Sequence, residues 1–575
     1  MPVDTAPVVL SRVRSTLASP RHLLAPVVVL VVALVTLVPV LFLIFSSFNT
    51  ALPAQEARYS LENWQAAFTD SRISNAIWTT VRLAVTRVAI AVVVGILFAW
   101  LIARTDMPGG STFEFLFWVA FFTPALPLTL GWILLLDPQT GLINRLLAQL
   151  PLVQPRFNIY SFWGIIWVHL TATTIPVAVI LFTPAFRQMS AALEDSARMC
   201  GASALMTLRR ITVPLLVPTI LPATAIMLIR SLEAFEIELL LGTPVGIYVY
   251  STRIYDLIDE SPPQFGMATA LGTLFLLAIF FLASLYLIYV RGRRFTTITG
   301  QGFSTERIKL GRWRWVAFGL CSLYLFLSFG LSLIFLVLGS FMRRFGFFNL
   351  KEPFTFSHWL ELLGDPILFS SLANSLILGT ATALLAVVLF SLVAYVIVRS
   401  QFAGRGLVDM MAWVPWAIPG VLMGLALLWL YLETPLRAVL YGTMTGLVLA
   451  MIIKELPVGT QLLKAGFVRL GNELEEAARI CGASWPLTYR RVILPLVSPV
   501  LINVAVLSFQ GAVRDIATVV FLYNNASRPL SILLLEYSFS GELERGAAVG
   551  ILLVVMISVM ALIARRLGYR AGTTT

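Results

Sequence analysis

Long apolar runs recur along the whole of this chain and constrain its fold more than any other feature. A helix needs about 20 apolar residues to cross a bilayer, and segments of that kind occur in two sets of six. The first set comprises residues 24–47, 75–103, 113–136, 161–185, 213–232 and 266–290. The second set comprises residues 315–340, 374–398, 409–431, 438–457, 493–513 and 546–564. We therefore predict an all-α polytopic membrane protein with about twelve transmembrane helices.

The composition supports insertion into a membrane. Hydrophobic residues make up 58% of the 575 residues and charged residues only 12%, whereas a soluble domain carries about 25% charged residues. The first apolar run is longer than the core of a signal peptide, about 7–15 residues, so we expect a retained span. The three cysteines, Cys200, Cys321 and Cys481, are too few for a disulfide framework, and we expect no metal site at them.

Basic residues are concentrated beside particular spans, so we interpret the net charge of +12 as a signal of membrane orientation rather than of nucleic-acid binding. They gather between the two sets of spans and in the tail, at Arg291, Arg293, Arg294, Arg307, Lys309, Arg312, Arg314, Arg565, Arg566 and Arg570. Loops rich in Lys and Arg stay in the cytoplasm. We therefore predict that both termini are cytoplasmic. The segment 341–373, with Arg343, Arg344 and Lys351, is a partial exception.

The two sets of spans are copies of one unit. Residues 193–214, LEDSARMCGASALMTLRRITVP, align without a gap with residues 474–495, LEEAARICGASWPLTYRRVILP. Residues 98–104 also parallel residues 393–399, and the prolines Pro124 and Pro127 parallel Pro415 and Pro419. An even number of spans separates the copies, so both face the same side of the membrane and the halves are parallel repeats. We predict one six-span domain at residues 1–300 and a second at residues 301–575.

The repeated segment has the residues of a short helix, a break and a second helix. In the second copy, Asn472 and Glu475 have the spacing of a capping box. Gly482 suits a left-handed helix stop, and Ser484 can cap the helix that follows. The counterparts in the first copy are Ser190 and Gly201. A bent pair of helices joined to a span can pass force from a soluble partner into the membrane, so we interpret each copy as a docking element.

The second copy resembles the EAA motif, which marks the permease subunits of binding-protein-dependent ABC importers. The resemblance is carried by Glu476-Ala477-Ala478, then Gly482, then Val492-Ile493-Leu494-Pro495. The first copy is a variant, with Asp195-Ser196-Ala197, Gly201 and Ile211-Thr212-Val213-Pro214. The resemblance covers essentially the whole chain as two fused permease domains and implies the type I ABC importer permease fold. The fused form is similar to the ferric-iron permeases.

This resemblance implies two partners and no cofactor bound by the chain itself. Each repeated segment would sit in a groove of one copy of a homodimeric ATPase, which would bind ATP and Mg²⁺, and a periplasmic binding protein would deliver the substrate. The sequence has no Gly-x-x-x-x-Gly-Lys-Ser/Thr loop for nucleotide phosphates, so we predict a permease of the bacterial inner membrane and no enzymatic activity. The residues assigned to ATPase coupling are Glu194, Asp195, Ala197, Arg198, Gly201, Glu475, Glu476, Ala477, Ala478, Arg479 and Gly482.

The resemblance also implies that the outer end of the fifth span of each half lies near the translocation pathway. The polar residues there are Glu233, Glu236, Glu238, Gln510, Arg514 and Asp515. Ionisable residues in spans are costly and are therefore functional candidates, and clustered acids would attract a hard cation such as Fe³⁺. The alternative is that these residues are only solvated at the interface. We expect His169, in the fourth span, to be packed and hydrogen-bonded.

Ferric iron is the predicted substrate, with thiamine, 2-aminoethylphosphonate and polyamines as alternatives for the same machinery. A secondary transporter with parallel repeats is an alternative of a different class. It requires ionisable residues near midspan, of which this sequence has few, and it gives the repeated segment no role. A membrane enzyme would require a catalytic cluster of His, Asp or Glu, and we find none of suitable spacing.

Overall fold

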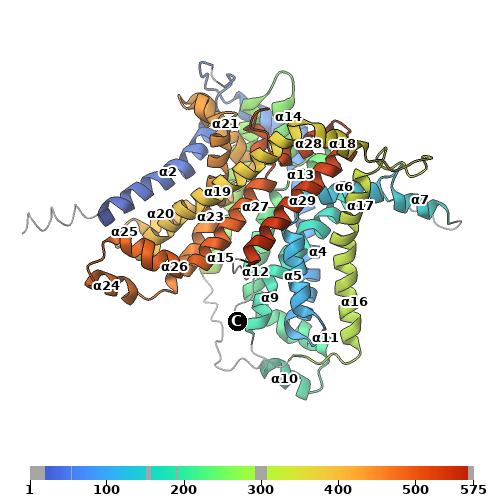
Figure 1. Ribbon diagram of the computed structural model, residues 1–575, viewed down its shortest axis with the longest axis horizontal. Coiled ribbons are helices and arrows are strands. Elements are labelled where there is room, and N and C mark those ends of the chain that lie inside the picture. The colour runs from blue at the N-terminus through green and yellow to red at the C-terminus, as the bar shows by residue number, and fades with distance from the viewer. Residues whose placement is uncertain (1–19, 54, 151–156, 190–191, 292–306, 567–575) are drawn as a thin grey trace, which may run out of the picture. The chain divides into compact units, whose positions relative to one another are not determined.

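The computed structural model describes residues 20–53, 55–150, 157–189, 192–291 and 307–566. Within these ranges the chain is helical, apart from turns and three isolated β-bridges, as Figure 1 shows. Among the described residues, 9 helices are long and apolar enough to cross a membrane, or up to 12 if each of 3 bent helix pairs forms one span. The predicted all-α polytopic fold is confirmed.

Each predicted apolar run overlaps one of these helices or helix pairs, although the run predicted at 438–457 is displaced from its helix, which spans Met444–Val468. The spans of the first half are α2 (Pro20–Ser46), α4 (Ser71–Arg104), α5 (Gly110–Phe122) with α6 (Ala125–Leu136), α8 (Phe162–His169) with η1 (Leu170–Thr174) and α9 (Ile175–Gln188), α11 (Ala204–Thr207) with η2 (Leu208–Thr212) and α12 (Val213–Leu232), and α15 (Phe265–Arg291). Those of the second half are α16 (Trp313–Leu325) with η4 (Phe326–Gly330) and α17 (Leu331–Ser340), α19 (Pro366–Arg399), α20 (Arg405–Trp413) with η5 (Val414–Ala417) and α21 (Gly420–Glu433), α23 (Met444–Val468), α25 (Trp485–Thr488) with η6 (Tyr489–Ile493), α26 (Leu494–Leu496) and α27 (Ser498–Arg514), and α29 (Leu543–Arg566).

Shorter helices connect the spans. They are α3 (Glu62–Thr69), α7 (Leu142–Ala148), α10 (Ala192–Met199), α13 (Glu236–Leu241), η3 (Thr243–Val245), α14 (Tyr250–Asp259), α18 (Ser357–Gly364), α22 (Arg437–Leu440), α24 (Glu473–Ile480), η7 (Val519–Phe521) and α28 (Leu530–Phe539). Two of them, α10 and α24, occupy the first part of the repeated segment.

The third span of each half is sharply bent, whereas continuous runs were expected at residues 113–136 and 409–431. The chain turns by 95° between α5 and α6 and by 106° between η5 and α21. Thr123 and Ile418, at these breaks, have extended backbones, with ψ of 131° and 115°. Each precedes a proline, whose ring disfavours helical geometry in the residue before it. The matched prolines therefore mark a bend that hydropathy alone does not reveal.

The eleventh span is also broken, by 79° between α26 and α27, while its counterpart runs unbroken from Ala204 to Leu232. Both copies carry proline at matched positions, Pro214 with Pro495 and Pro218 with Pro499. Proline alone therefore does not account for this difference between the halves.

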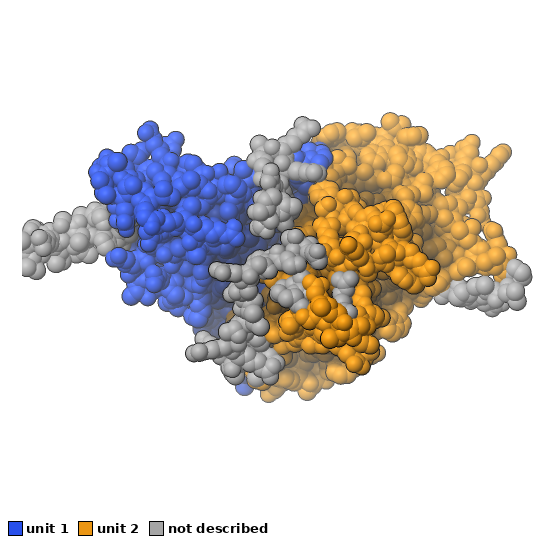
Figure 2. Space-filling model, turned by 90° about the horizontal axis from the view of Figure 1, so that it is seen from below, with its two compact units in different colours: residues 1–63, 370–529, 559–575 blue, residues 64–369, 530–558 orange. Residues whose placement is uncertain are grey.

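The chain forms two compact units, which Figure 2 distinguishes by colour. Unit 1 comprises residues 1–63, 370–529 and 559–575, and unit 2 comprises residues 64–369 and 530–558. Helix α2 packs on α20 and α21 within unit 1, whereas α17 packs on α6 within unit 2. The first span of each half thus belongs to the unit built mainly from the other half. The predicted domains 1–300 and 301–575 describe the sequence repeats, and their boundary lies outside the described residues.

Small residues allow the closest helix contacts in unit 2. A Cβ atom on Gly131 of α6 would lie 2.1 Å from the carbonyl oxygen of Ser332 on α17. A Cβ atom on Gly95 of α4 would lie 2.4 Å from the Cβ of Ala178 on α9. Helices in membranes associate through such close backbone approach, because lipid provides no hydrophobic force between them. The second of these contacts packs α4 against α9, and the last residue of α4 reaches the site described next.

Candidate functional site

The repeated segment folds into a helix, a glycine turn and a second helix in both copies, and we call each of these structures an elbow. The first elbow is α10, Gly201 and α11, and the second is α24, Gly482 and α25. The two glycines have φ of +85° and +80°, a left-handed conformation that is costly for residues with a Cβ. In each elbow the backbone N–H three residues beyond the end of the helix donates to a carbonyl in the last turn, from Ala202 to Ala197 and from Ala483 to Ala478. The predicted glycine stop is confirmed in both copies.

The predicted capping box of the second elbow is wrong. Asn472 has helical dihedral angles, φ −70° and ψ −24°, and its side chain makes no capping hydrogen bond. Glu475 does not reach back to the helix start, because its side chain is turned inward and engaged there. Ser484 stands at the start of α25 without a side-chain cap, whereas Ser203 accepts a hydrogen bond from the Met206 amide at 3.3 Å. Ser190 lies outside the described residues.

The inner side of the first elbow carries a buried ion pair. Glu194 on α10 is 1% exposed, and Arg104, the last residue of α4, is 5% exposed. Nε of Arg104 donates to Oε2 of Glu194 at 3.0 Å, and Nη2 of the same arginine donates to the same oxygen. The hydroxyl of Thr212 on η2 donates to the other carboxylate oxygen at 2.7 Å. One carboxylate therefore joins the end of α4, the elbow helix and the start of the fifth span.

The matched pair is present in the second elbow with different neighbours. Nε of Arg399, the last residue of α19, lies 3.6 Å from Oε1 of Glu475. The Tyr395 hydroxyl donates to Oε2 of Glu475 at 3.2 Å. Nη2 of Arg399 also donates to the carbonyl oxygens of Phe467 and Leu470, at 3.1 and 2.5 Å. Arg399 thus links the ends of α19 and α23 to α24.

Aromatic rings reinforce the second elbow. Trp485 and Tyr489 stack with ring centroids 5.3 Å apart, and Tyr395 packs edge-on against both. The Trp485 indole donates to the Tyr395 hydroxyl at 2.9 Å. The positions that match Trp485 and Tyr489 in the first copy hold Ala204 and Leu208. The two elbows are therefore held by different chemistry although their backbones share one plan.

The outer side of each elbow presents apolar side chains. Met199 is 89% exposed and Ile480, at the same position of the repeat, is 87% exposed. Leu193 and its counterpart Leu474 are also exposed. Exposed apolar side chains are candidates for a protein interaction site where they form one patch. The motif itself did not single out these apolar positions.

The residues predicted to couple to an ATPase divide into two groups. Glu194 and Glu475 face inward and are engaged within the chain. The exposed or half-buried members are Asp195, Ala197, Glu476, Ala477, Ala478 and Arg479, together with the glycines Gly201 and Gly482. The side chain of Arg198 lies outside the described residues. Among the coupling residues whose side chains are described, only the second group is accessible to a docking partner.

The acids predicted near the pathway in the first half lie in unlike surroundings. Glu238 on α13 is buried, and its Oε1 lies 2.9 Å from Nη1 of Arg87 and 2.8 Å from Nε2 of His169. Glu233 forms an ion pair with Arg230 at 2.8 Å, and Glu236 is the first residue of α13 and half-buried. His169 is packed and hydrogen-bonded, as predicted.

The second half holds a partly buried ion pair. Asp515 pairs with Lys454 of α23, and its second oxygen accepts from the Thr518 amide at 2.9 Å. Gln510 is buried and Arg514 is half-buried on the same helix, α27. Arg87 and Lys454 were not predicted, although each lies in a predicted span, where an ionisable residue is a functional candidate. In the described residues no group of three or more His, Cys, Asp or Glu could hold a metal ion.

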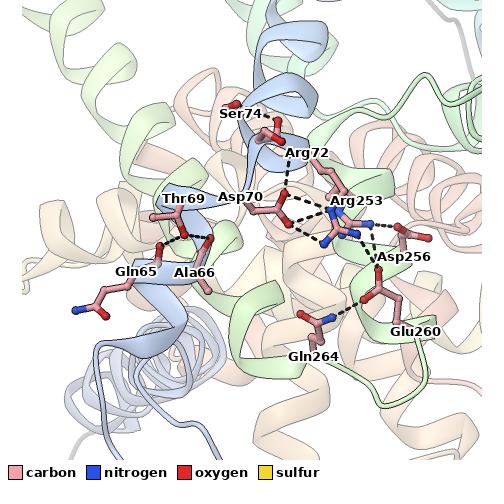
Figure 3. A network of polar contacts seen from close by, with 11 residues as sticks. Gln65, Ala66, Thr69, Asp70, Arg72, Ser74, Arg253, Asp256, Glu260 and Gln264 are labelled. Carbon is pink, nitrogen blue, oxygen red and sulfur yellow. Dashed lines mark hydrogen bonds and ion pairs between the residues drawn. The ribbon is translucent and has the colours of Figure 1, made fainter.

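A polar network ties the start of α4 to α14 (Figure 3). Asp70 caps α4 by accepting from the Arg72 amide at 2.8 Å, and its hydrogen bond with the Arg72 side chain lowers the pKa of its carboxyl group. Arg253, which is buried, pairs with Asp256 and lies 3.2 Å from Glu260. This network anchors α4 at the end opposite to Arg104.

Comparison with known proteins provides evidence independent of this geometry. The model of the family described as "Binding-protein-dependent transport system inner membrane component" matches residues 91–295 and 386–572, once in each half. The chain is 27% identical over 511 residues to a probable ABC transporter permease protein of Sinorhizobium fredii, covering 85% of this chain and 86% of that protein. It is 26% identical over 436 residues to a putative ferric transport system permease protein of Haemophilus influenzae, covering 74% of this chain and 66% of that protein.

A solved structure resembles part of the chain. It is a crystal structure of a bacterial ABC transporter involved in the import of the acidic polysaccharide alginate, and one of its chains matches with a TM-score of 0.42 and 19% identity. The match covers 49% of this chain and 99% of that one. The two family matches each contain one elbow.

Proposed function

The chain belongs to the family of binding-protein-dependent transport system inner membrane components, and from this premise we propose that it is the permease of an ATP-driven importer whose two elbows receive the ATPase subunits. The family match covers about two thirds of the chain and includes both elbows. The permease would pass a small substrate from a binding protein outside the membrane to the cytoplasm.

One observation carries the docking proposal: the same position of the repeat is almost fully exposed and apolar in both elbows. Met199 and Ile480 are 89% and 87% exposed. Burying a side chain of that kind in a partner's groove stabilises the complex by about 25 cal/mol per Å² of apolar surface removed from water. Because the two elbows present this feature in register, they suit two copies of one partner rather than two unrelated proteins.

The partner would supply the energy. The sequence contains no Gly-x-x-x-x-Gly-Lys-Ser/Thr loop, the usual cradle for nucleotide phosphates. ATP and Mg²⁺ would therefore bind to the ATPase, and the permease would convert movement of the ATPase into movement of its spans. The proposal requires both elbows on the cytoplasmic side. The predicted cytoplasmic location of the termini and the basic residues Arg209, Arg210, Arg490 and Arg491 beside the elbows support this orientation.

Ferric iron is the substrate that we propose. The similarity to a putative ferric transport system permease supports it, and the acids Glu233 and Glu236 at the end of α12 and the start of α13 suit a hard cation. Glu238 is less available for transport, because Arg87 and His169 already engage its carboxylate. Thiamine, 2-aminoethylphosphonate and polyamines are the alternatives for the same machinery.

A secondary transporter finds less support. Its coupling ion would need ionisable groups inside the spans that are able to change partners. Glu238 is paired with Arg87 and His169, and Asp515 is paired with Lys454, within the described residues. Both acids are thus compensated by basic groups of the same unit.

The docking proposal is tested by purifying the tagged chain from its native membrane and assaying for a bound P-loop ATPase. We expect two ATPase copies per chain, and we expect Met199→Glu together with Ile480→Glu to abolish their retention. Val245→Glu is the matched control, because Val245 is also apolar and exposed but lies in η3, beyond the opposite end of α12. Equal retention by the elbow variant and the control would refute docking at the elbows.

The substrate proposal needs a separate experiment. The binding protein that docks on the chain is purified without added ligand, and its bound metal and organic ligand are identified by mass spectrometry. Uptake into proteoliposomes is then measured with the loaded binding protein, the ATPase and the permease. We expect bound ferric iron and uptake that requires ATP. An organic ligand would replace iron in the proposal, whereas ATP-independent uptake driven by an ion gradient would favour the secondary transporter.

A further inference from the structure

We propose that Arg104 and Arg399, the last residues of α4 and α19, are positioning residues that brace each elbow against its own bundle through the buried carboxylates of Glu194 and Glu475. This inference rests on the proposed function, in which the elbows receive an ATPase. The arginines would not touch ATP, substrate or ATPase. They would make the elbow and the long span move together.

The contacts of Glu194 define the brace in the first elbow. Its two carboxylate oxygens bond to different elements, one to Arg104 on α4 and the other to Thr212 on η2. Helix α10 itself carries Glu194. A rotation or displacement of α10 relative to α4 would break charge-assisted hydrogen bonds in a place from which water is excluded, as the 1% exposure of Glu194 indicates. A push on α10 is therefore transmitted to α4 and α12 together.

Arg399 builds the second brace from a different set of contacts. It lies 3.6 Å from Glu475 and also donates to the carbonyl oxygens of Phe467, in the last turn of α23, and of Leu470, just after that helix. Tyr395, one helical turn before Arg399 on α19, donates to the same carboxylate. The second elbow is thus tied to the ends of two spans, α19 and α23. The planar guanidinium makes these contacts at once, which a lysine ammonium group at a single point does not.

The recurrence of the pair argues against an accidental contact. Arg104 and Arg399 are the final residues of the matched stretches 98–104 and 393–399, and Glu194 and Glu475 are matched in the elbows. The chain between arginine and glutamate differs in length, with 90 residues from Arg104 to Glu194 and 76 residues from Arg399 to Glu475. The two halves have therefore diverged in the intervening segments while the same pair forms at the same place in each.

A buried ion pair is a poor source of stability, because the cost of removing both charges from water offsets their attraction. What such a pair contributes is a fixed relative position of its two side chains. Losing one partner leaves the other charge buried and uncompensated. The pairs occur where an elbow meets a long span, a place where defined geometry matters more than net stability under the proposed function. These features favour a role in transmitting movement from the elbow to the span over a role in stabilising the fold alone.

The first test needs no partner protein. Hydrogen–deuterium exchange is measured on the full chain in nanodiscs for Arg104→Gln, Arg399→Gln and the control Arg187→Gln. Arg187 is also near the end of a span, α9, but its ion pair is with Glu114 on α5 rather than with an elbow. We expect Arg104→Gln to raise exchange at least tenfold in residues 192–203 and to leave residues 473–484 unchanged. Arg399→Gln should do the reverse, and Arg187→Gln should change neither.

The second test measures coupling in proteoliposomes that contain the permease, its ATPase and the loaded binding protein. We expect the Gln variants to assemble with the ATPase and to hydrolyse ATP at near the unmutated rate, while substrate imported per ATP falls at least tenfold. Arg104→Lys retains the positive charge but not the planar guanidinium with its several donors. It should give an intermediate amount of substrate imported per ATP. A uniform loss of assembly and of both rates would mean that the pairs only stabilise the fold, and it would overturn the proposal.

The two tests separate the brace from the function on which it rests. Unchanged exchange in both elbows overturns the brace whatever the ATPase does. An unmutated chain that neither binds an ATPase nor imports substrate with ATP overturns the proposed function, and the exchange measurement then still decides whether the arginines hold the elbows. Thr212→Val and Tyr395→Phe extend the test, since each should loosen only the elbow whose glutamate it contacts.

Discussion

Arg87 on α4 and Glu238 on α13 form a buried ion pair, with 2.9 Å between Nη1 and Oε1 and the His169 ring nitrogen 2.8 Å from the same oxygen. Nε of Arg87 also donates to the Ser231 hydroxyl at 2.7 Å. The second, fourth and fifth spans of the first half are thus joined around one carboxylate. Two basic side chains of the chain itself, Arg87 and His169, thus engage one oxygen of this buried carboxylate.

We expect Glu238→Gln to destabilise the protein, because it leaves the Arg87 charge buried without its partner. Removing one member of a buried pair costs about 3–5 kcal/mol. The measurement is thermal or denaturant-induced unfolding in detergent. The control is Glu233→Gln, which breaks the partly exposed ion pair with Arg230 and should cost at most about 1 kcal/mol. Equal effects of the two variants would show that burial of the Arg87 pair has no energetic importance.

Gly131 should tolerate no side chain. A Cβ there would meet the Ser332 carbonyl at 2.1 Å, so Gly131→Ala must separate α6 from α17 or shift their backbones. Overpacking of this kind typically costs about 1–3 kcal/mol. Gly319 on α16 is the control, because nothing lies within 4 Å of the position of its Cβ. Melting temperatures of Gly131→Ala and Gly319→Ala in detergent compare the two, and a loss confined to Gly131→Ala is the expected result.

The cysteines provide natural reporters of the elbows. Cys200 and Cys481 are exposed in the first and second elbows, and Cys321 is buried in α16. We expect a maleimide to label Cys200 and Cys481 rapidly and Cys321 only after unfolding, as followed by peptide mass spectrometry. A membrane-impermeant maleimide should reach both elbow cysteines from the cytoplasmic side alone. Labelling of either from the outside would contradict the proposed orientation.

Substitutions on the outer side of the elbows should uncouple ATP hydrolysis from import. We expect Glu476→Lys to reverse a charge at the docking surface without disturbing Glu475, since Glu476 is exposed. Gly482→Pro should act differently, because proline cannot adopt the φ of +80° found there. Import per ATP is the quantity to measure. Normal coupling in both variants would show that the second elbow does not transmit force.

The first elbow should respond less strongly. Asp195→Lys reverses the matched charge, but Asp195 is half-buried whereas Glu476 is exposed. We expect a smaller loss of import per ATP than for Glu476→Lys, measured in the same proteoliposomes. An equal or greater loss would indicate that the two elbows make equivalent contacts with the ATPase.

The sequence alone determined the all-α polytopic class, the repeats and the glycine stops of the elbows. These features are local, or they compare one stretch of chain with another: a span needs about 20 apolar residues, and a left-handed turn favours glycine. The EAA motif of the second copy was also recognised from the sequence, because it is defined by the spacing of Glu476, Gly482 and Pro495 along the chain. The bends of the third spans were partly encoded in Pro124 and Pro419, but hydropathy averages over such breaks.

Only the tertiary structure decided which way each polar side chain faces. Glu475 and Glu476 are neighbours in one acidic stretch, yet Glu475 is buried against Arg399 and Glu476 is exposed. Their difference depends on the end of α19, more than seventy residues earlier in the chain. Likewise, α2 packs in the unit formed mostly by the second half. The physical reason is that burial and ion pairing depend on contacts between distant segments, whereas helix formation and chain reversal depend on residues adjacent in the sequence.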